Sequence, residues 1–135
     1  MPKPSNPIEV YIDSDERFAV TPEALDFFKL LEDPSNMYFS QHADVFIACM
    51  AIGISYGKFT PDQGKDTIMI LSVYRSRDPQ GIFPLLVKAL HPELDKKQLA
   101  DRMEDYAIAG VEYLKQQYEK VGRIDYDFFK ALAET

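Results

Sequence analysis

The sequence predicts a single all-α domain, a bundle of about five helices around a central apolar helix, with or without a short N-terminal strand. Three observations lead to this prediction. Apolar residues recur at helical spacing in several segments, and capping residues and prolines punctuate those segments. One helix, residues 41–56, is apolar all round and must be surrounded by other helices. We expect residues 1–20 to form an extended arm or short strand and residues 21–135 to form the helical domain.

The composition supports a soluble globular protein. The chain has 135 residues, enough for one domain with a single core, and its 46% of hydrophobic residues argues against wholesale disorder. A single cysteine cannot form an internal disulfide, and the N-terminal residues contain no apolar stretch of signal-peptide length. The apolar run within residues 41–56 is shorter than the roughly 20 residues that span a bilayer. These features predict a cytoplasmic protein without a membrane segment.

The first elements are defined by local signals. "IEVYI" (8–12) alternates apolar and polar residues, which predicts a short strand. The following helix, over 21–33, has Thr21 as its cap, Pro22 at its first position and Pro34 at its end. Ser40 and Gly57 then bracket the central helix as N-cap and C-cap.

The second half of the chain contains one ambiguous segment and three further helices. Residues 67–77 fit neither period cleanly; we favour a helix there, with a strand as the alternative. Asp78-Pro79 predicts a helix start, and Pro84 either kinks that helix or delays its beginning. Asp95 and Gln98 resemble a capping box at the start of a long helix over 96–121. Gly122 closes it, and a last helix begins at Asp125.

Two glycines inside predicted helices suggest a helix crossing. Gly53 and Gly110 each cost roughly 1 kcal/mol relative to alanine in a helix interior, so something must offset that cost. We expect the two helices to approach closely at these glycines. Ile108 falls on the charged side of its helix, which makes it a candidate exposed contact for a partner.

The sequence contains no recognisable catalytic motif. Phosphate-binding loops, nucleophile elbows and zinc-ligand spacings are absent from it. Cys49 lies among apolar residues and is expected to be buried and unreactive, while His42 and His91 lie in different segments. Neighbouring carboxylates such as Glu104 and Asp105 are interpreted as part of a solvated helix face. The sequence therefore predicts a non-enzymatic protein with no metal and no cofactor.

The charge of the chain favours protein partners over nucleic acid. The net charge is −7, whereas phosphate binding requires clustered cations. Four residues remain candidate nucleic-acid contacts if they converge on one surface: Arg75, Arg77, Lys96 and Lys97. Three functions follow: a protein-interaction protein, which we favour, a small DNA-binding regulator, or an acidic DNA mimic with its carboxylates in two rows. A homodimer is compatible with the sequence, which does not fix it.

Two stretches resemble a known family. "ADVFIACMAIGISYGK" (43–58) resembles the "kDvFmfAaalGy" helix of small proteins associated with the Dnd system, which introduces phosphorothioate linkages into DNA. "MEDYAIAGVEYLK" (103–115) is similar to the "EYAngGleiL" segment of that family, although residues 107–110 replace a run like Ala-Asn-Gly-Gly. The resemblance covers about residues 40–133 and implies an accessory protein of a DNA-modification or host-defence system. It carries over no catalytic residues.

Overall fold

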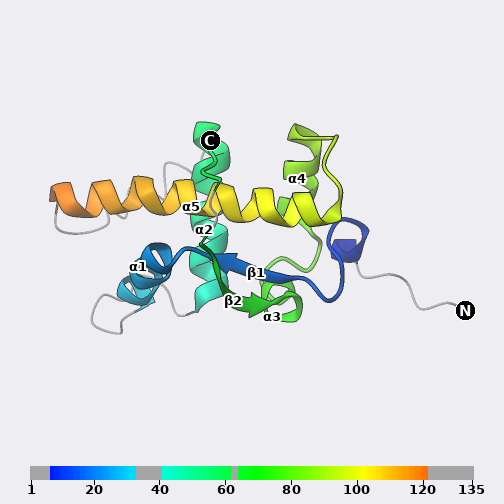
Figure 1. Cartoon of the computed structure of the whole chain (residues 1–135), viewed down its shortest axis with the longest axis horizontal. Helices are drawn as coiled ribbons and strands as arrows, with labels where there is room; N and C mark the ends of the chain where they lie inside the picture. Colours follow the sequence, from blue (N-terminus) through cyan, green and yellow to red (C-terminus); the bar gives the residue numbers. More distant parts are fainter. Residues whose placement is uncertain (1–6, 33–40, 62–63, 122–135) are drawn as a thin grey trace, which may run out of the picture.

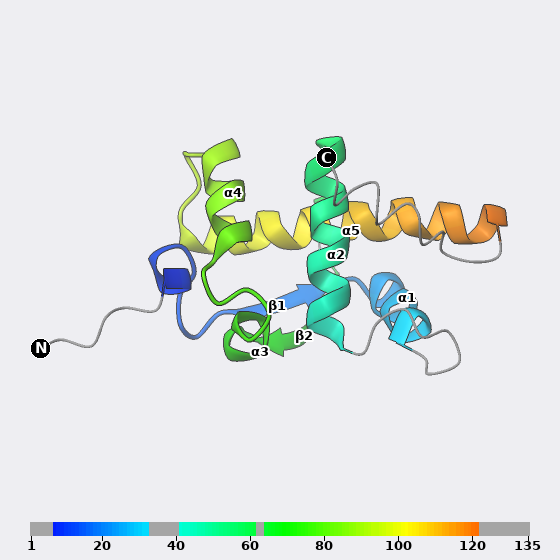
Figure 2. The ribbon, with the colours of Figure 1, turned by 180° about the vertical axis from the view of Figure 1, so that it is seen from behind.

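The computed structural model describes residues 7–32, 41–61 and 64–121. Figure 1 shows α5 running across the middle of α2, with α1, α3 and the strands on one side of α5 and α4 on the other. The same arrangement seen from behind places α2 in front of α5 (Figure 2). The elements along the chain are η1 (Pro7–Val10), β1 (Arg17–Val20), α1 (Pro22–Glu32), α2 (His42–Tyr56), β2 (Asp66–Ile70), α3 (Leu71–Arg75), α4 (Ile82–Leu90) and α5 (Lys96–Val121).

The fold is mostly helical, as expected, but it is not all-α. β1 and β2 pair in an antiparallel two-stranded sheet, with Phe18 opposite Met69 and Ala19 opposite Thr67. The register shifts between these pairs, so Ile68 is an extra residue in β2. For β2, the sequence pattern favours a helix and gives a strand only as the alternative.

Two segments differ from their predicted structure. Residues 8–12 are not a strand: η1 is a 3-10 turn there, and Ile8 and Ile12 are fully buried in the core. The N-terminal strand lies further along, at Arg17–Val20. Residues 67–77 contain both alternatives in succession, the end of β2 and then α3, which explains why neither period fitted.

The helices with strong local signals agree with the sequence. Thr21 Oγ1 accepts a hydrogen bond from the Ala24 N–H at 3.1 Å at the start of α1. Gly57 caps α2 in the left-handed conformation, with φ 64°. Asp95 and Gln98 form a reciprocal capping box at the start of α5, with distances of 2.8 and 3.0 Å. The signals predicted at Pro34, Ser40, Gly122 and Asp125 lie outside the described residues.

The contact between α2 and α5 is a close crossing at the two predicted glycines. A Cβ atom added to Gly53 would collide with the carbonyl group of Tyr106, and one added to Gly110 would collide with the backbone of Cys49. The contacts are reciprocal, because each glycine lies one helical turn after the residue that the other glycine faces. The absence of a side chain at both positions therefore lets the two backbones touch.

The centre of α5 is enclosed more completely than the sequence indicated. Every residue from Met103 to Val111 is buried, because α2, α4, α1 and β1 all pack against α5. Ile108 is only 3% exposed and belongs to the core, so the prediction that it is an exposed partner contact is wrong. Glu104 and Asp105 are also buried, which corrects the solvated-face interpretation.

We expect alanine at Gly110 or Gly53 to lower the free energy of unfolding by about 3 kcal/mol, because the new Cβ has no space beside a rigid backbone. Leucine at either position should prevent folding altogether. Gly64→Ala is the matched control, since no heavy atom lies within 4 Å of a Cβ added there. Urea unfolding of the three alanine variants measures the difference. Equal stabilities of Gly110→Ala and the wild type would contradict the close crossing.

Candidate functional site

The most unusual surface of the described structure is the outer face of α4. Four large aliphatic side chains on this nine-residue helix are about half exposed: Ile82 53%, Leu85 48%, Leu86 43% and Leu90 55%. They follow the spacing i, i+3, i+4, i+8, which places them on one side of the helix. We call this surface the α4 face. A helix that is apolar all round is normally buried, so the exposure of this side needs an explanation.

The opposite side of α4 is fixed to the rest of the fold. Pro84 and Val87 are buried, and α4 packs against α5. The helix begins at Ile82 because the Asp78 carboxylate accepts hydrogen bonds from the N–H groups of Ile82 (2.9 Å) and Phe83 (3.1 Å). The Tyr74 hydroxyl donates to the same carboxylate at 2.8 Å. Pro84 therefore lies in the first turn, where it neither breaks a hydrogen bond nor kinks the helix.

The α4 face carries no available charge. Lys88 is the one charged residue of α4, and its ammonium group donates to the carbonyl oxygens of Pro92 (2.7 Å) and Leu94 (2.5 Å). The lysine thus closes the loop that follows α4 instead of interrupting the apolar surface. Hydrogen bonds therefore hold both ends of α4, and its outer side chains are exposed to solvent.

A second feature is a buried charge cluster between α5 and the sheet. Glu104 is 3% exposed, and its carboxylate accepts hydrogen bonds from the Ala19 N–H (2.6 Å) and from Lys65 (3.2 Å). Lys65 also donates to Asp105 at 2.8 Å. The cluster lies beneath an open hollow of about 440 Å³, lined by Asp15, Glu16, Arg17, Ala19, Lys65, Thr67, Lys97, Asp101 and Glu104.

Burial dominates the electrostatics of this cluster. Burial raises the pKa of Glu104 to about 7, and the Ala19 N–H and the Lys65 ammonium offset that rise only in part. Burial also raises the pKa of Asp105, again against the opposing effect of Lys65. For Lys65, burial lowers the pKa, but its two carboxylate partners more than compensate and leave it raised. Both oxygens of Glu104, one oxygen of Asp105 and the Lys65 ammonium have protein partners, so the geometry fits a structural link between α5 and β1.

A third feature surrounds His91 at the C-terminal end of α4. Arg102 donates to His91 Nδ1 at 3.0 Å, so the ring proton lies on Nε2, which bonds the Tyr106 hydroxyl at 2.7 Å. Burial, followed by the nearby guanidinium of Arg102, lowers the pKa of His91. Arg102 also stacks over the Phe59 ring, 4.1 Å from its centre. Both imidazole nitrogens are therefore engaged in positioning this corner.

The other residues considered for chemistry are also engaged. Cys49 is fully buried, as the sequence predicted, and burial raises the pKa of its thiol. His42 contacts the Glu32 carboxylate at 2.5 Å and lies far along the chain from His91. No group of three or more His, Cys, Asp and Glu residues within the described part of the chain has the arrangement of a metal site.

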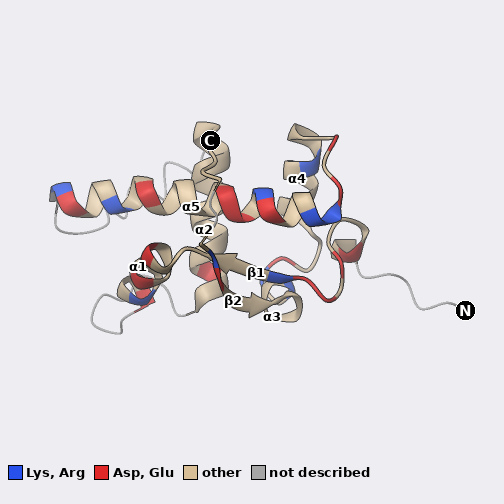
Figure 3. Ribbon diagram, in the orientation of Figure 1, with Lys and Arg blue, Asp and Glu red and all other residues tan. Residues whose placement is uncertain are grey.

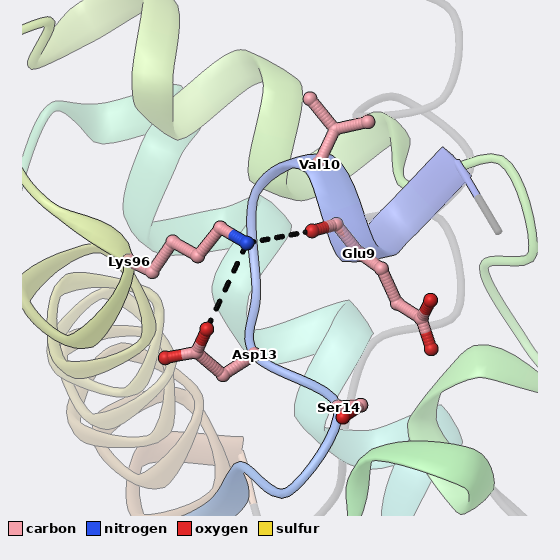
Figure 4. Close-up of a pocket in the computed structure, with 5 residues that line it drawn as sticks. All are labelled: Glu9, Val10, Asp13, Ser14 and Lys96. Atoms are coloured by element: carbon pink, nitrogen blue, oxygen red, sulfur yellow. Dashed lines mark hydrogen bonds and ion pairs between the residues drawn. The ribbon is translucent and has the colours of Figure 1, made fainter. Parts of the chain in front are cut away.

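The four predicted nucleic-acid contacts do not form a free basic surface. Arg77 pairs with Asp44 at 3.2 Å, and Lys97 contacts Glu16 (3.0 Å) and Asp101 (3.4 Å). Figure 4 shows Lys96 held between the carbonyl oxygen of Glu9 (3.0 Å) and the Asp13 carboxylate (3.7 Å), at the side of a small hollow. Arg75 makes no ion pair with any residue that the structure describes, and it is half-buried.

The carboxylates of the described chain are not arranged in two rows either. Figure 3 shows acidic and basic positions interleaved along α5, with further acidic positions on α1 and in the segments around η1 and β1. This distribution gives little support to the DNA-mimic alternative. Among the candidate functions, protein interaction is the one for which the described residues offer a matching surface, the α4 face.

No protein-family model, curated protein sequence or solved structure matches this chain. The resemblance to Dnd-associated proteins therefore stays a prediction. None of the helices in the described ranges has the length and the apolar character needed to cross a membrane. The α4 face was missed at the sequence level, although a signal was present: eight of the nine residues of α4 are uncharged and apolar or proline, more than one buried side requires.

We expect the stability of this protein to fall as pH rises from about 4.5 to about 7. The folded chain raises the pKa of Glu104 from its usual 4.5 to about 7, so the folded state binds more protons than the unfolded state in this interval. The resulting loss is on the order of 3 kcal/mol at most. Urea unfolding at four pH values across this interval measures it.

Glu104→Gln should flatten this pH dependence, because glutamine keeps an oxygen for the Ala19 N–H and cannot titrate. Glu119→Gln, an exposed change on the same helix, is the control and should keep the wild-type slope. If the two variants show the same slope, Glu104 is not the source of the pH dependence.

We expect a labelled DNA duplex to show no rise in fluorescence anisotropy when titrated with this protein, even at low salt. Three of the four candidate cations are paired with carboxylates, and the net charge is −7. Tight binding that weakens steeply with salt would contradict this expectation. Alanine substitutions at the four cations would then identify the contact.

Proposed function

We propose that this protein is a non-enzymatic interaction protein that docks another protein surface on the α4 face. The observation that supports the proposal is the exposure of four aliphatic side chains on a helix whose other side is already packed. The largest exposed apolar patch of a monomeric protein is often a functional one. The spacing of the four side chains is the one by which a helix inserts its anchors into an apolar groove or packs on another helix.

The remaining features favour this proposal over catalysis. The buried thiol, the doubly engaged imidazole of His91 and the fully partnered Glu104 each have a structural role in the geometry. The exposed surfaces of the α4 face, by contrast, pack against no other described part of the fold. As part of the same proposal, we place the partner in a DNA-modification or host-defence system, because residues 43–58 and 103–115 resemble segments of Dnd-associated proteins.

The test is a comparison of variants used as bait in an extract of the cell that makes the protein. We expect a partner that is retained by the wild type and lost by the double variant Leu85→Ser/Leu86→Ser. Removing two half-exposed leucines from a contact costs about 2 kcal/mol, which corresponds to roughly a thirtyfold increase in Kd. The purified partner is then titrated against each variant to measure that Kd.

The matched control is Gln116→Ser/Glu119→Ser, because both residues are exposed on α5 outside the α4 face. This variant should bind the partner as the wild type does. Circular dichroism melting of all three baits checks that they are folded. Partners that bind the Leu85→Ser/Leu86→Ser variant as tightly as the wild type would overturn the proposed role of the α4 face.

A further inference from the structure

The chemistry of the residues in and around the α4 face limits which kinds of molecule can cover it. The face is aliphatic along its whole length, and Lys88 is held away by two backbone carbonyl groups. Two copies of the chain, each with a net charge of −7, would repel each other over most of their surfaces. At the α4 face, however, they can meet without placing like charges opposite one another.

The geometry of a single short helix also suits self-association. In an antiparallel pair, Leu85 and Leu86 lie at the centre of the contact, and Ile82 of one copy approaches Leu90 of the other. The contact is then isologous, so each apolar residue meets an apolar residue. The helix dipoles are antiparallel in this arrangement, which is their favourable orientation. Figures 1 and 2 show that α4 projects from one side of α5.

The available area indicates how strong such a contact can be. Four half-exposed aliphatic side chains offer on the order of 400 Å² per copy, or about 800 Å² for a symmetric pair. The total lies in the range of weak, reversible interfaces.

We infer that the α4 face is covered by a second copy of this chain, in a symmetric antiparallel pairing of α4 with α4 that forms a weak, reversible dimer. The inference rests on the proposed function, because it names the partner of the same face. An anionic membrane surface is a poorer occupant, since the chain is acidic and the cation of α4 is already bound to carbonyl groups. A different protein with an apolar groove is the competing outcome of the test.

The first experiment is sedimentation equilibrium of the purified full chain from about 1 μM to about 1 mM. We expect a monomer at the low end and a growing fraction of dimer at the high end. Leu86→Glu should remain monomeric throughout, because it places two carboxylates at the centre of the contact. Gln116→Glu adds the same charge at an exposed position of α5 and should dimerise as the wild type does.

The second experiment locates the contact by cross-linking. Cys49, the one cysteine of the chain, is fully buried, so a thiol introduced at the surface is the reactive one. Packed helices lie about 8–10 Å apart, within reach of a short bismaleimide. Leu86→Cys should therefore form covalent dimers at concentrations where Gln116→Cys forms few. This readout remains informative if Leu86→Glu fails to fold.

The outcomes separate this inference from the proposed function. A monomer at every concentration, a dimer unaffected by Leu86→Glu, or equal cross-linking at positions 86 and 116 would overturn the inference. If a different protein is then captured through Leu85 and Leu86, that protein is the occupant and the proposed function stands. If neither a dimer nor an α4-dependent partner is found, both are wrong.

Discussion

The backbone contact between α2 and α5 is the constraint on which the rest of the structure depends. Gly53 faces Tyr106 and Gly110 faces Cys49, so two contacts one helical turn apart on each helix fix where the helices cross. Side chains at these points would push the helices apart. The close approach leaves Phe46, Cys49 and Met50 fully buried, which accounts for the uniformly apolar sequence of α2. It also compensates for the cost of two glycines in helix interiors.

The same crossing explains why charge is buried at the centre of α5. Once α2 covers one side of α5 and the sheet covers another, Glu104 and Asp105 are largely shielded from bulk water. Burying a carboxylate is expensive unless it is paired and hydrogen-bonded, and Lys65 and the Ala19 N–H offset part of that cost. These bonds in turn attach the sheet of β1 and β2 to α5. The sheet is therefore held by polar contacts as well as by Phe18 and Val20 in the core.

The sequence predicted the parts of the fold that depend on local signals. The caps at Thr21, Gly57 and Asp95 act within one helical turn. Gly53 and Gly110 were recognisable because glycine destabilises a helix interior, which indicates that the position requires the absence of a side chain. It failed where distant segments decide the outcome. β1 pairs with β2, about fifty positions further along the chain, and Ile108 is buried by elements that its helical periodicity does not report. The candidate cations failed as a site for a similar reason, because carboxylates distant in sequence pair with Lys96 and Lys97.

The comparison of α2 with α4 locates the surface on which function is to be sought. Both helices are apolar on almost all sides, a composition that is typical of helices in the interior of a protein. The apolar side chains of α2 are mostly buried within the chain, because α5, α1 and β2 pack around this helix. α4 packs against the fold on one side only, and its other side stays exposed. The hydrogen bonds of Asp78 and Lys88 hold the two ends of α4 in this orientation. The exposed side of α4 is therefore left uncovered by the residues that the structure describes.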